Sequence, residues 1–176
     1  MRALLDGLYK LAGALAAVFL TAIAVLILAQ IIGRFFNVLV PSANEFAGFS
    51  MAASSFLALA YTFRAGGHIR VTLVILRLPE GTRRIFELTS LAAGAVLIAF
   101  FAWHAVLLVL DSWEYDDLSD GLIAIPLWIP QCGMAAGLIV LAIALVDELV
   151  QVIRGHTPSY ATAEDVVLGP LAKPDD

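Results

Sequence analysis

Residues 11–33 read LAGALAAVFLTAIAVLILAQIIG, a run of 23 residues without an Asp, Glu, Lys or Arg. Three further runs lack these four residue types and cover residues 46–63, 88–110 and 121–146. A helix of about 20 residues crosses the ~30 Å hydrocarbon core of a bilayer, because it rises ~1.5 Å per residue. The four runs therefore predict transmembrane helices. The first run is longer than the ~7–15-residue core of a cleaved signal sequence, so we expect it to be a transmembrane helix.

The composition of the whole chain agrees with this prediction. Of the 176 residues, 61% are hydrophobic and 14% are charged, and the mean hydropathy is +0.94. A soluble domain has about a quarter of its residues charged, so this chain has too few polar side chains to cover a water-exposed surface. The single cysteine, Cys132, excludes an intrachain disulfide, a CxxC redox pair and a four-thiolate metal site. Nucleic acid is not an expected partner, since the few basic residues lie between apolar runs.

The prolines near the last run predict where the fourth helix begins. Pro126 and Pro130 bracket its entry, and proline is tolerated in the first turn of a helix but costs about 3 kcal/mol in the interior. We therefore expect the membrane-crossing part to begin near Pro130. The expected spans are about 11–33, 46–63, 88–110 and 130–150, within a single domain of residues 1–154. Residues 155–176 are rich in glycine, proline and acids, which predicts a flexible cytoplasmic tail.

The placement of lysine and arginine predicts which side of the membrane each end faces. Nine of the ten basic residues lie before the first span, between the second and third spans, or after the fourth, and the tenth is Arg34. Basic residues favour the cytoplasmic side, and four spans place both termini on one side. The expected fold is therefore an all-α membrane protein with four transmembrane helices and cytoplasmic N- and C-termini.

The gap between the second and third spans predicts an amphipathic interfacial helix at about residues 69–78. Its aliphatic residues recur at spacings of four and three, whereas Arg70 and Arg77 are seven residues apart. On a helix these two sets occupy different sides. Such a helix would lie along the membrane surface with its arginines toward the lipid headgroups. A strand or a re-entrant segment is the alternative.

Acidic residues gather in the gap between the third and fourth spans, beside several tryptophans. One interpretation is a solvated loop on the outer side, and the other is a docking surface for an extracytoplasmic partner. The candidate docking residues are Asp116, Asp117, Asp120 and Trp128.

Two smaller groups of polar residues lie at helix ends. Arg34 and Glu45 flank the short gap between the first two spans. They either pair across a tight turn, or Arg34 reaches a lipid phosphate alone. Arg64, His68 and Arg70 follow the second span and are either a basic helix terminus held in the cytoplasm or a contact with lipid or a partner.

The spans themselves offer little chemistry. Their middles carry no ionisable side chain, so we expect no enzyme activity, no metal or cofactor site and no solute pathway within this chain. His68 and His156 are predicted on the opposite side of the membrane from His104, which excludes a bis-histidine haem within one chain. The alternatives are a self-associating small four-helix membrane transporter and a membrane haem protein in which two copies share a haem through His104.

Four short stretches are similar to a known family. They are GRF at 33–35, NEFA at 44–47, YTFRAGGHIRV at 61–71 and IPLWIP at 125–130. Together, over about residues 5–153, they resemble the small membrane subunit (DctQ type) of tripartite ATP-independent periplasmic (TRAP) transporters. The stretch RAGGHIR is the most specific of these similarities.

The resemblance implies a three-component secondary transporter in the bacterial inner membrane. A periplasmic binding protein would capture the solute, usually an organic acid, and a large membrane subunit would carry it inward with sodium. The small subunit would contact the scaffold of the large one and help to dock the binding protein. The expected contacts with lipid or with the large subunit are Arg34, Glu45, Arg64, His68, Arg70 and Arg77.

Overall fold

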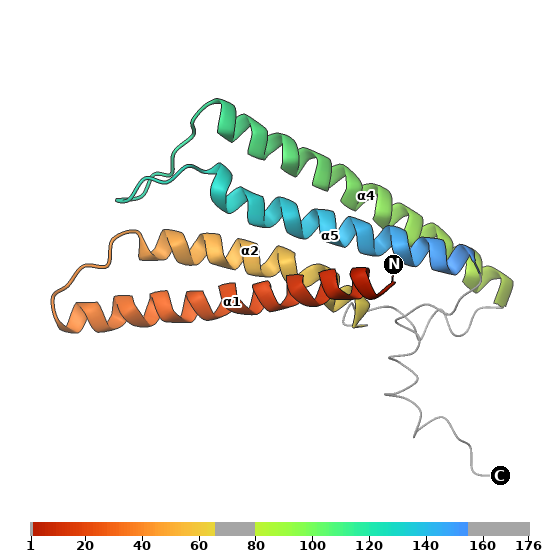
Figure 1. Ribbon diagram of the computed structural model, residues 1–176, viewed down its shortest axis with the longest axis horizontal. Helices are drawn as coiled ribbons and strands as arrows, with labels where there is room; N and C mark the ends of the chain where they lie inside the picture. Colours follow the sequence, from red (N-terminus) through yellow and green to blue (C-terminus); the bar gives the residue numbers. More distant parts are fainter. Residues whose placement is uncertain (1, 66–79, 155–176) are drawn as a thin grey trace, which may run out of the picture.

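The computed structural model describes residues 2–65 and 80–154, and these residues form four long helices. The helices are α1 (Arg2–Phe35), α2 (Ala43–Arg64), α4 (Glu80–Glu114) and α5 (Trp128–Ile153) (Figure 1). Each is long and apolar enough to cross a membrane, so the prediction of an all-α protein with four such helices is confirmed. The predicted interfacial helix at 69–78 and the tail at 155–176 lie outside the described residues.

Helices α1, α2 and α4 extend beyond the charge-free runs at both ends, whereas α5 begins inside its run and extends beyond the end of it. Helix α1 ends where the carbonyl of Gly33 accepts hydrogen bonds from the amides of Phe36 at 3.1 Å and Val38 at 2.8 Å. Helix α5 begins at Trp128, so Pro130 lies in its first turn. Proline is favourable there because the first amides of a helix have no intrahelical acceptor.

The four helices form a single row rather than a closed bundle. Helix α1 packs on α2, α2 on α5 and α5 on α4, whereas α1 and α5 barely meet (Figure 1). The 36–42 and 115–127 connections lie together at one end of the row, which we call the loop end. The start of α1 and the ends of α2 and α5 lie at the opposite end, which we call the terminal end. The row therefore has two edge helices, α1 and α4.

Small residues allow the two central helices to approach closely. Gly133 and Gly137 lie four residues apart on α5, and a Cβ atom added to Gly137 would overlap the carbonyl carbon of Phe56 on α2. A Cβ atom at Gly133 would be 2.9 Å from that of Ala53. Helices in lipid associate through such close van der Waals packing, since the bilayer gives no hydrophobic driving force between them. The α2–α5 seam therefore joins the two helical hairpins.

The burial pattern is the reverse of that in a soluble protein. Alanine is prominent among the buried side chains, whereas large apolar side chains cover the outside of the row. Leu28 and Ile32 on α1, and Phe100 and Trp103 on α4, are more than half exposed. Such a surface is stable only against lipid or another protein.

Candidate functional site

Arg64, the last residue of α2, lies at the centre of an ionic cluster at the terminal end. Its Nη2 atom is 2.8 Å from Asp6 Oδ1 of α1, and its Nη1 atom is 3.1 Å from Asp147 Oδ2 of α5. Glu148, whose side chain is fully buried, places Oε2 3.9 Å from the same guanidinium. One guanidinium therefore joins three helices through charged contacts, which are stronger than neutral hydrogen bonds.

Two further side chains complete this cluster. The guanidinium carbon of Arg64 lies 5.2 Å from the centroid of the Tyr9 ring, within the range of a cation–π contact. The amide of Gln151 donates a hydrogen bond of 3.0 Å to Asp147 Oδ2. Tyr9 is 2% exposed, so this part of the cluster is shielded from solvent and lipid. We call Asp6, Tyr9, Arg64, Asp147, Glu148 and Gln151 the Arg64 cluster.

The partners of Arg64 were not among the residues predicted from the sequence. Arg64 was expected to contact lipid or a large subunit, and the structure shows its guanidinium bound to carboxylates of its own chain. The sequence does contain a pattern that could have indicated these partners. Asp6 lies near the start of the first helix, Asp147 and Glu148 lie near the end of the fourth, and these helix ends are expected on the same side as Arg64. His68, Arg70 and Arg77 lie outside the described residues.

At the loop end, the acidic connection between α4 and α5 forms a short hairpin at 115–127. The amide of Ser119 donates to the carbonyl of Ile125 at 2.9 Å, and the amide of Leu127 donates to the carbonyl of Asp117 at the same distance. The hydroxyl of Ser119 accepts a hydrogen bond from the amide of Ile125 at 3.2 Å. Asp116 takes a left-handed conformation with φ 49° at the turn out of α4. The hairpin therefore holds its acids on a defined backbone.

The tip of this hairpin contacts the start of α2. The amide of Ile123 donates a hydrogen bond of 2.9 Å to the hydroxyl of Ser42. The backbone of Gly121 lies so close to the Glu45 carboxylate that a Cβ atom there would overlap it. Glu45 Oε2 is buried and has no hydrogen-bond partner among residues 2–65 and 80–154, while Arg34 is exposed and forms no ion pair with Glu45. We call Ser42, Glu45, Gly121 and Ile123 the loop clasp.

A surface hollow of about 800 Å³ lies between the end of α4 and the start of α5. The centroids of the Trp113 and Trp128 rings are 4.8 Å apart, and the ring planes are inclined by 65°. Trp113 is 61% exposed. We call this hollow the Trp pocket, and its lining residues are Leu110, Trp113, Glu114, Asp116 and Trp128.

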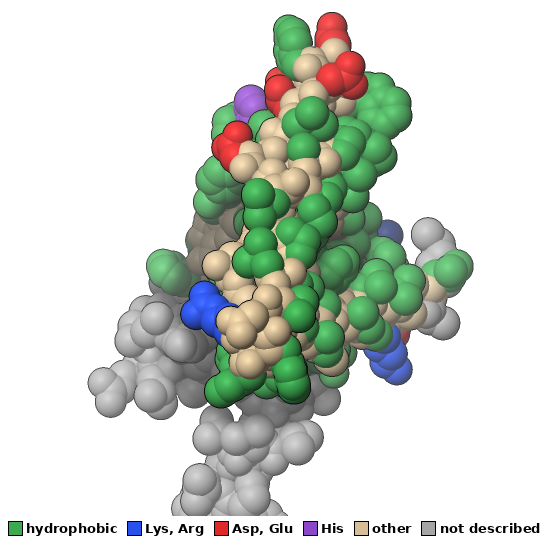
Figure 2. All heavy atoms as spheres, turned by 90° about the vertical axis from the view of Figure 1, so that its left-hand side faces the viewer, with side chains coloured by type: hydrophobic (Ala, Val, Ile, Leu, Met, Phe, Trp, Pro, Cys, Tyr) green, Lys and Arg blue, Asp and Glu red, His purple; other side chains and the backbone are tan. Residues whose placement is uncertain are grey.

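The Trp pocket contains part of the predicted docking set. Asp116 and Trp128 line it, whereas Asp117 and Asp120 are exposed on the hairpin and are not lining residues. Seen from the loop end, acidic side chains gather at the edge of the row where α4 lies (Figure 2). Glu114 also lines the pocket and was not among the predicted docking residues, although it belongs to the acidic residues between the third and fourth spans.

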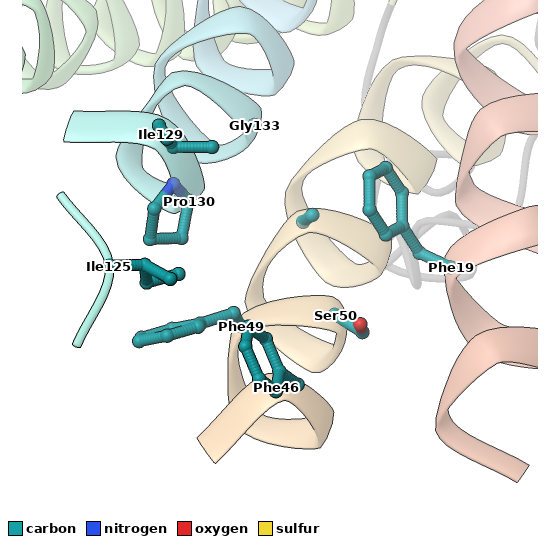
Figure 3. Close-up of a pocket in the computed structure, with 9 residues that line it drawn as sticks. Phe19, Phe46, Phe49, Ser50, Ile125, Ile129, Pro130 and Gly133 are labelled. Atoms are coloured by element: carbon teal, nitrogen blue, oxygen red, sulfur yellow. The ribbon is translucent and has the colours of Figure 1, made fainter. Parts of the chain in front are cut away.

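A second hollow, of about 250 Å³, lies between α1, α2 and the start of α5 (Figure 3). Phe19 of α1, Phe46 and Phe49 of α2 and Pro130 of α5 are among its lining residues. Its walls are almost entirely carbon, so an acyl chain or an apolar side chain fits it better than a charged solute.

Comparison with known families supplies the identification. Residues 23–155 match the family described as "Tripartite ATP-independent periplasmic transporters, DctQ component". The chain belongs to this DctQ family. Comparisons with curated proteins and with solved structures gave no match.

Membership confirms the resemblance seen in the sequence. DctQ proteins are components of a transporter and not a family of enzymes, and they work with a large membrane subunit and a periplasmic binding protein. This DctQ chain is therefore a multi-pass membrane protein and a small subunit of a TRAP transporter.

Proposed function

We propose that this DctQ subunit is a fixed scaffold for the large membrane subunit and contributes to the docking surface for the periplasmic binding protein. The complex takes up an organic acid together with sodium, across the bacterial inner membrane. The observation that carries this proposal is the open row of helices in a chain of this family.

The proposed orientation puts the loop end in the periplasm and the terminal end in the cytoplasm. The support is the distribution of basic residues along the sequence, because nine of the ten lie before the first charge-free run, between the second and third, or after the fourth. In this orientation the acidic hairpin and the Trp pocket face the compartment of the binding protein.

The scaffold role follows from the shape of the row. Because α1 and α4 each pack on one neighbour, much of their apolar surface is left for contacts outside the chain. A closed four-helix bundle would bury part of this surface by packing its first and last helices together. A large subunit that contacts one edge helix would form a broad, stationary scaffold together with this chain. A transport domain of the large subunit would move against this scaffold.

The chain is poorly suited to carry the solute itself. The ion pairs of the described residues all involve Arg64, at the terminal end rather than at mid-membrane. The described lining of the hollow between α1, α2 and α5 is apolar apart from Ser50 and includes no basic side chain that would bind an organic anion. We therefore assign solute and sodium binding to the large subunit.

The test is purification of the tagged protein from native membranes in a gentle detergent, combined with site-specific photocrosslinking. A photoreactive phenylalanine analogue at Leu28 or Phe101 samples the two exposed edges, and the same analogue at exposed Tyr115 samples the hairpin. We expect a larger polytopic protein to co-purify in equal amount and to be crosslinked from at least one edge. Recovery of the chain only as a homo-oligomer, with crosslinks only between its own copies, would reject the proposal.

A further inference from the structure

We propose that the Trp pocket binds a lysine or arginine side chain of the periplasmic binding protein. This inference rests on the proposed function, which supplies the partner and the orientation. It adds a specific chemical contact to the general docking surface.

The aromatic walls of the pocket suit a cation. Trp113 comes from the end of α4 and Trp128 from the start of α5, and their rings are inclined to one another rather than stacked flat. Because Trp113 is 61% exposed, ring surface remains open to a partner. A cation placed over an indole face is attracted by the negative charge of the ring face, and tryptophan is the best aromatic residue for this contact.

The acidic members of the pocket supply the complementary charge. Glu114 and Asp116 are both exposed, and neither forms an ion pair within the described part of the chain. Among the residues that the structure describes, the lining contains no lysine or arginine that would neutralise them. A side chain that combines a positive charge with an aliphatic stem would contact both carboxylates and rings, with Leu110 beside the stem.

The backbone around the pocket is held in place before a partner arrives. The amide of Tyr115 donates to the carbonyl of Asp111 at 2.9 Å, and the amide of Asp117 donates to that of Ser112 at 3.2 Å. Ser112 is 2% exposed, so this turn is anchored in the packed part of α4. A site ordered in advance loses less conformational entropy on binding.

The same chemistry argues against a lipid headgroup as the occupant. Tryptophans at a membrane interface also contact headgroups, and some headgroups carry an ammonium. Every phospholipid headgroup, however, brings a phosphate toward Glu114 and Asp116, whose charges repel it. A protein side chain offers the cation without the attached anion.

The test uses the complete three-component transporter reconstituted in vesicles. The measured quantity is the concentration of binding protein that gives half-maximal uptake. The double variant Glu114→Gln/Asp116→Asn keeps the shape of the pocket and removes its charge, and Trp113→Leu removes one ring. We expect each to raise the half-maximal concentration about tenfold, with the maximal rate unchanged. Asp120→Asn, a matched neutralisation on the same hairpin outside the pocket, should leave it within about twofold.

A charge exchange then identifies the partner residue. Asp116→Lys should impair uptake, and changing one basic residue of the binding protein to Asp should restore it. An equal effect of Asp120→Asn, or no effect of the pocket variants, would overturn the inference. A further outcome is that the half-maximal concentration changes with the phosphatidylethanolamine content of the vesicles and with no basic residue of the binding protein. That result would assign the pocket to lipid and would also overturn the inference.

Failure of this inference is distinguishable from failure of the proposed function. In the first case the wild-type subunit still co-purifies with the large subunit and supports uptake, while the pocket variants behave like wild type. In the second case the wild-type chain neither co-purifies nor supports uptake.

Discussion

The two ends of the helix row are held together by different interactions. At the terminal end, Arg64 joins α1, α2 and α5 through carboxylates that are partly or fully buried. At the loop end, a serine hydroxyl and a close backbone contact attach the hairpin to α2, and no ion pair is formed there by the described residues. The acids of the Arg64 cluster therefore contact a guanidinium of their own chain, whereas the acids of the hairpin are exposed.

The largest difference between the ends should appear when one arginine is removed from each. Arg64→Met leaves three carboxylates near each other without their shared guanidinium, and we expect it to destabilise the protein by about 3 kcal/mol. Arg34→Met removes an exposed arginine from the last turn of α1 at the loop end and should change stability by less than about 0.5 kcal/mol. Unfolding by a denaturing detergent, followed by tryptophan fluorescence, measures both.

Arg64→Lys sharpens this measurement. Lysine keeps the charge but lacks the planar fork that reaches Asp6 and Asp147 together, so its cost should lie between those of wild type and Arg64→Met. Equal stability of Arg64→Met and Arg34→Met would show that the Arg64 cluster does not stabilise the fold.

A smaller difference in stability is expected between variants of the two acids that accept hydrogen bonds from Arg64. Asp147 is 21% exposed and accepts hydrogen bonds from Arg64 and Gln151, so Asp147→Asn should cost about 2 kcal/mol. Asp6 is 47% exposed and its contact is screened by solvent, so Asp6→Asn should cost about 0.5 kcal/mol. The same unfolding assay, with each change repeated in the Arg64→Met background, tests whether both effects depend on Arg64. An equal cost in that background would contradict the assigned pairing.

The most local effect should come from the loop clasp. Gly121→Ala places a Cβ atom on the Glu45 carboxylate, so the hairpin tip must move, at an expected cost of about 1 kcal/mol. Gly48→Ala is the matched control, because nothing lies within 4 Å of its Cβ position on α2. We expect faster amide hydrogen exchange around Ile123 in Gly121→Ala only. Unchanged exchange there would mean that the loop clasp does not hold the hairpin.

The four helices could be predicted from the sequence because they depend on one local property. A run of 18 to 26 residues without charge has no stable location in water, whatever its neighbours are. The DctQ resemblance was equally local, since its motifs lie at the ends of the spans, and the family match confirms it.

The order of the helices and the partners of Arg64 could not be predicted in the same way. They depend on which helices approach closely, and this is decided by a few small residues such as Gly133 and Gly137 on α5. Their spacing is visible in the sequence, but nothing local shows that α2, rather than α1 or α4, packs against them. For the same reason, Glu45 was considered beside Arg34, its neighbour across a short gap, and not beside Gly121, 76 positions further along the chain.

The single-row arrangement has a mechanical consequence. A row is one helix thick, roughly 10–12 Å, and among the four described helices its central members, α2 and α5, pack mainly on the helices at their two sides. A load applied by a partner on one broad face therefore reaches the opposite face through a single layer of side chains. We therefore expect resistance to bending across the row to depend largely on the α2–α5 seam, with the Arg64 cluster joining three of the helices at one end.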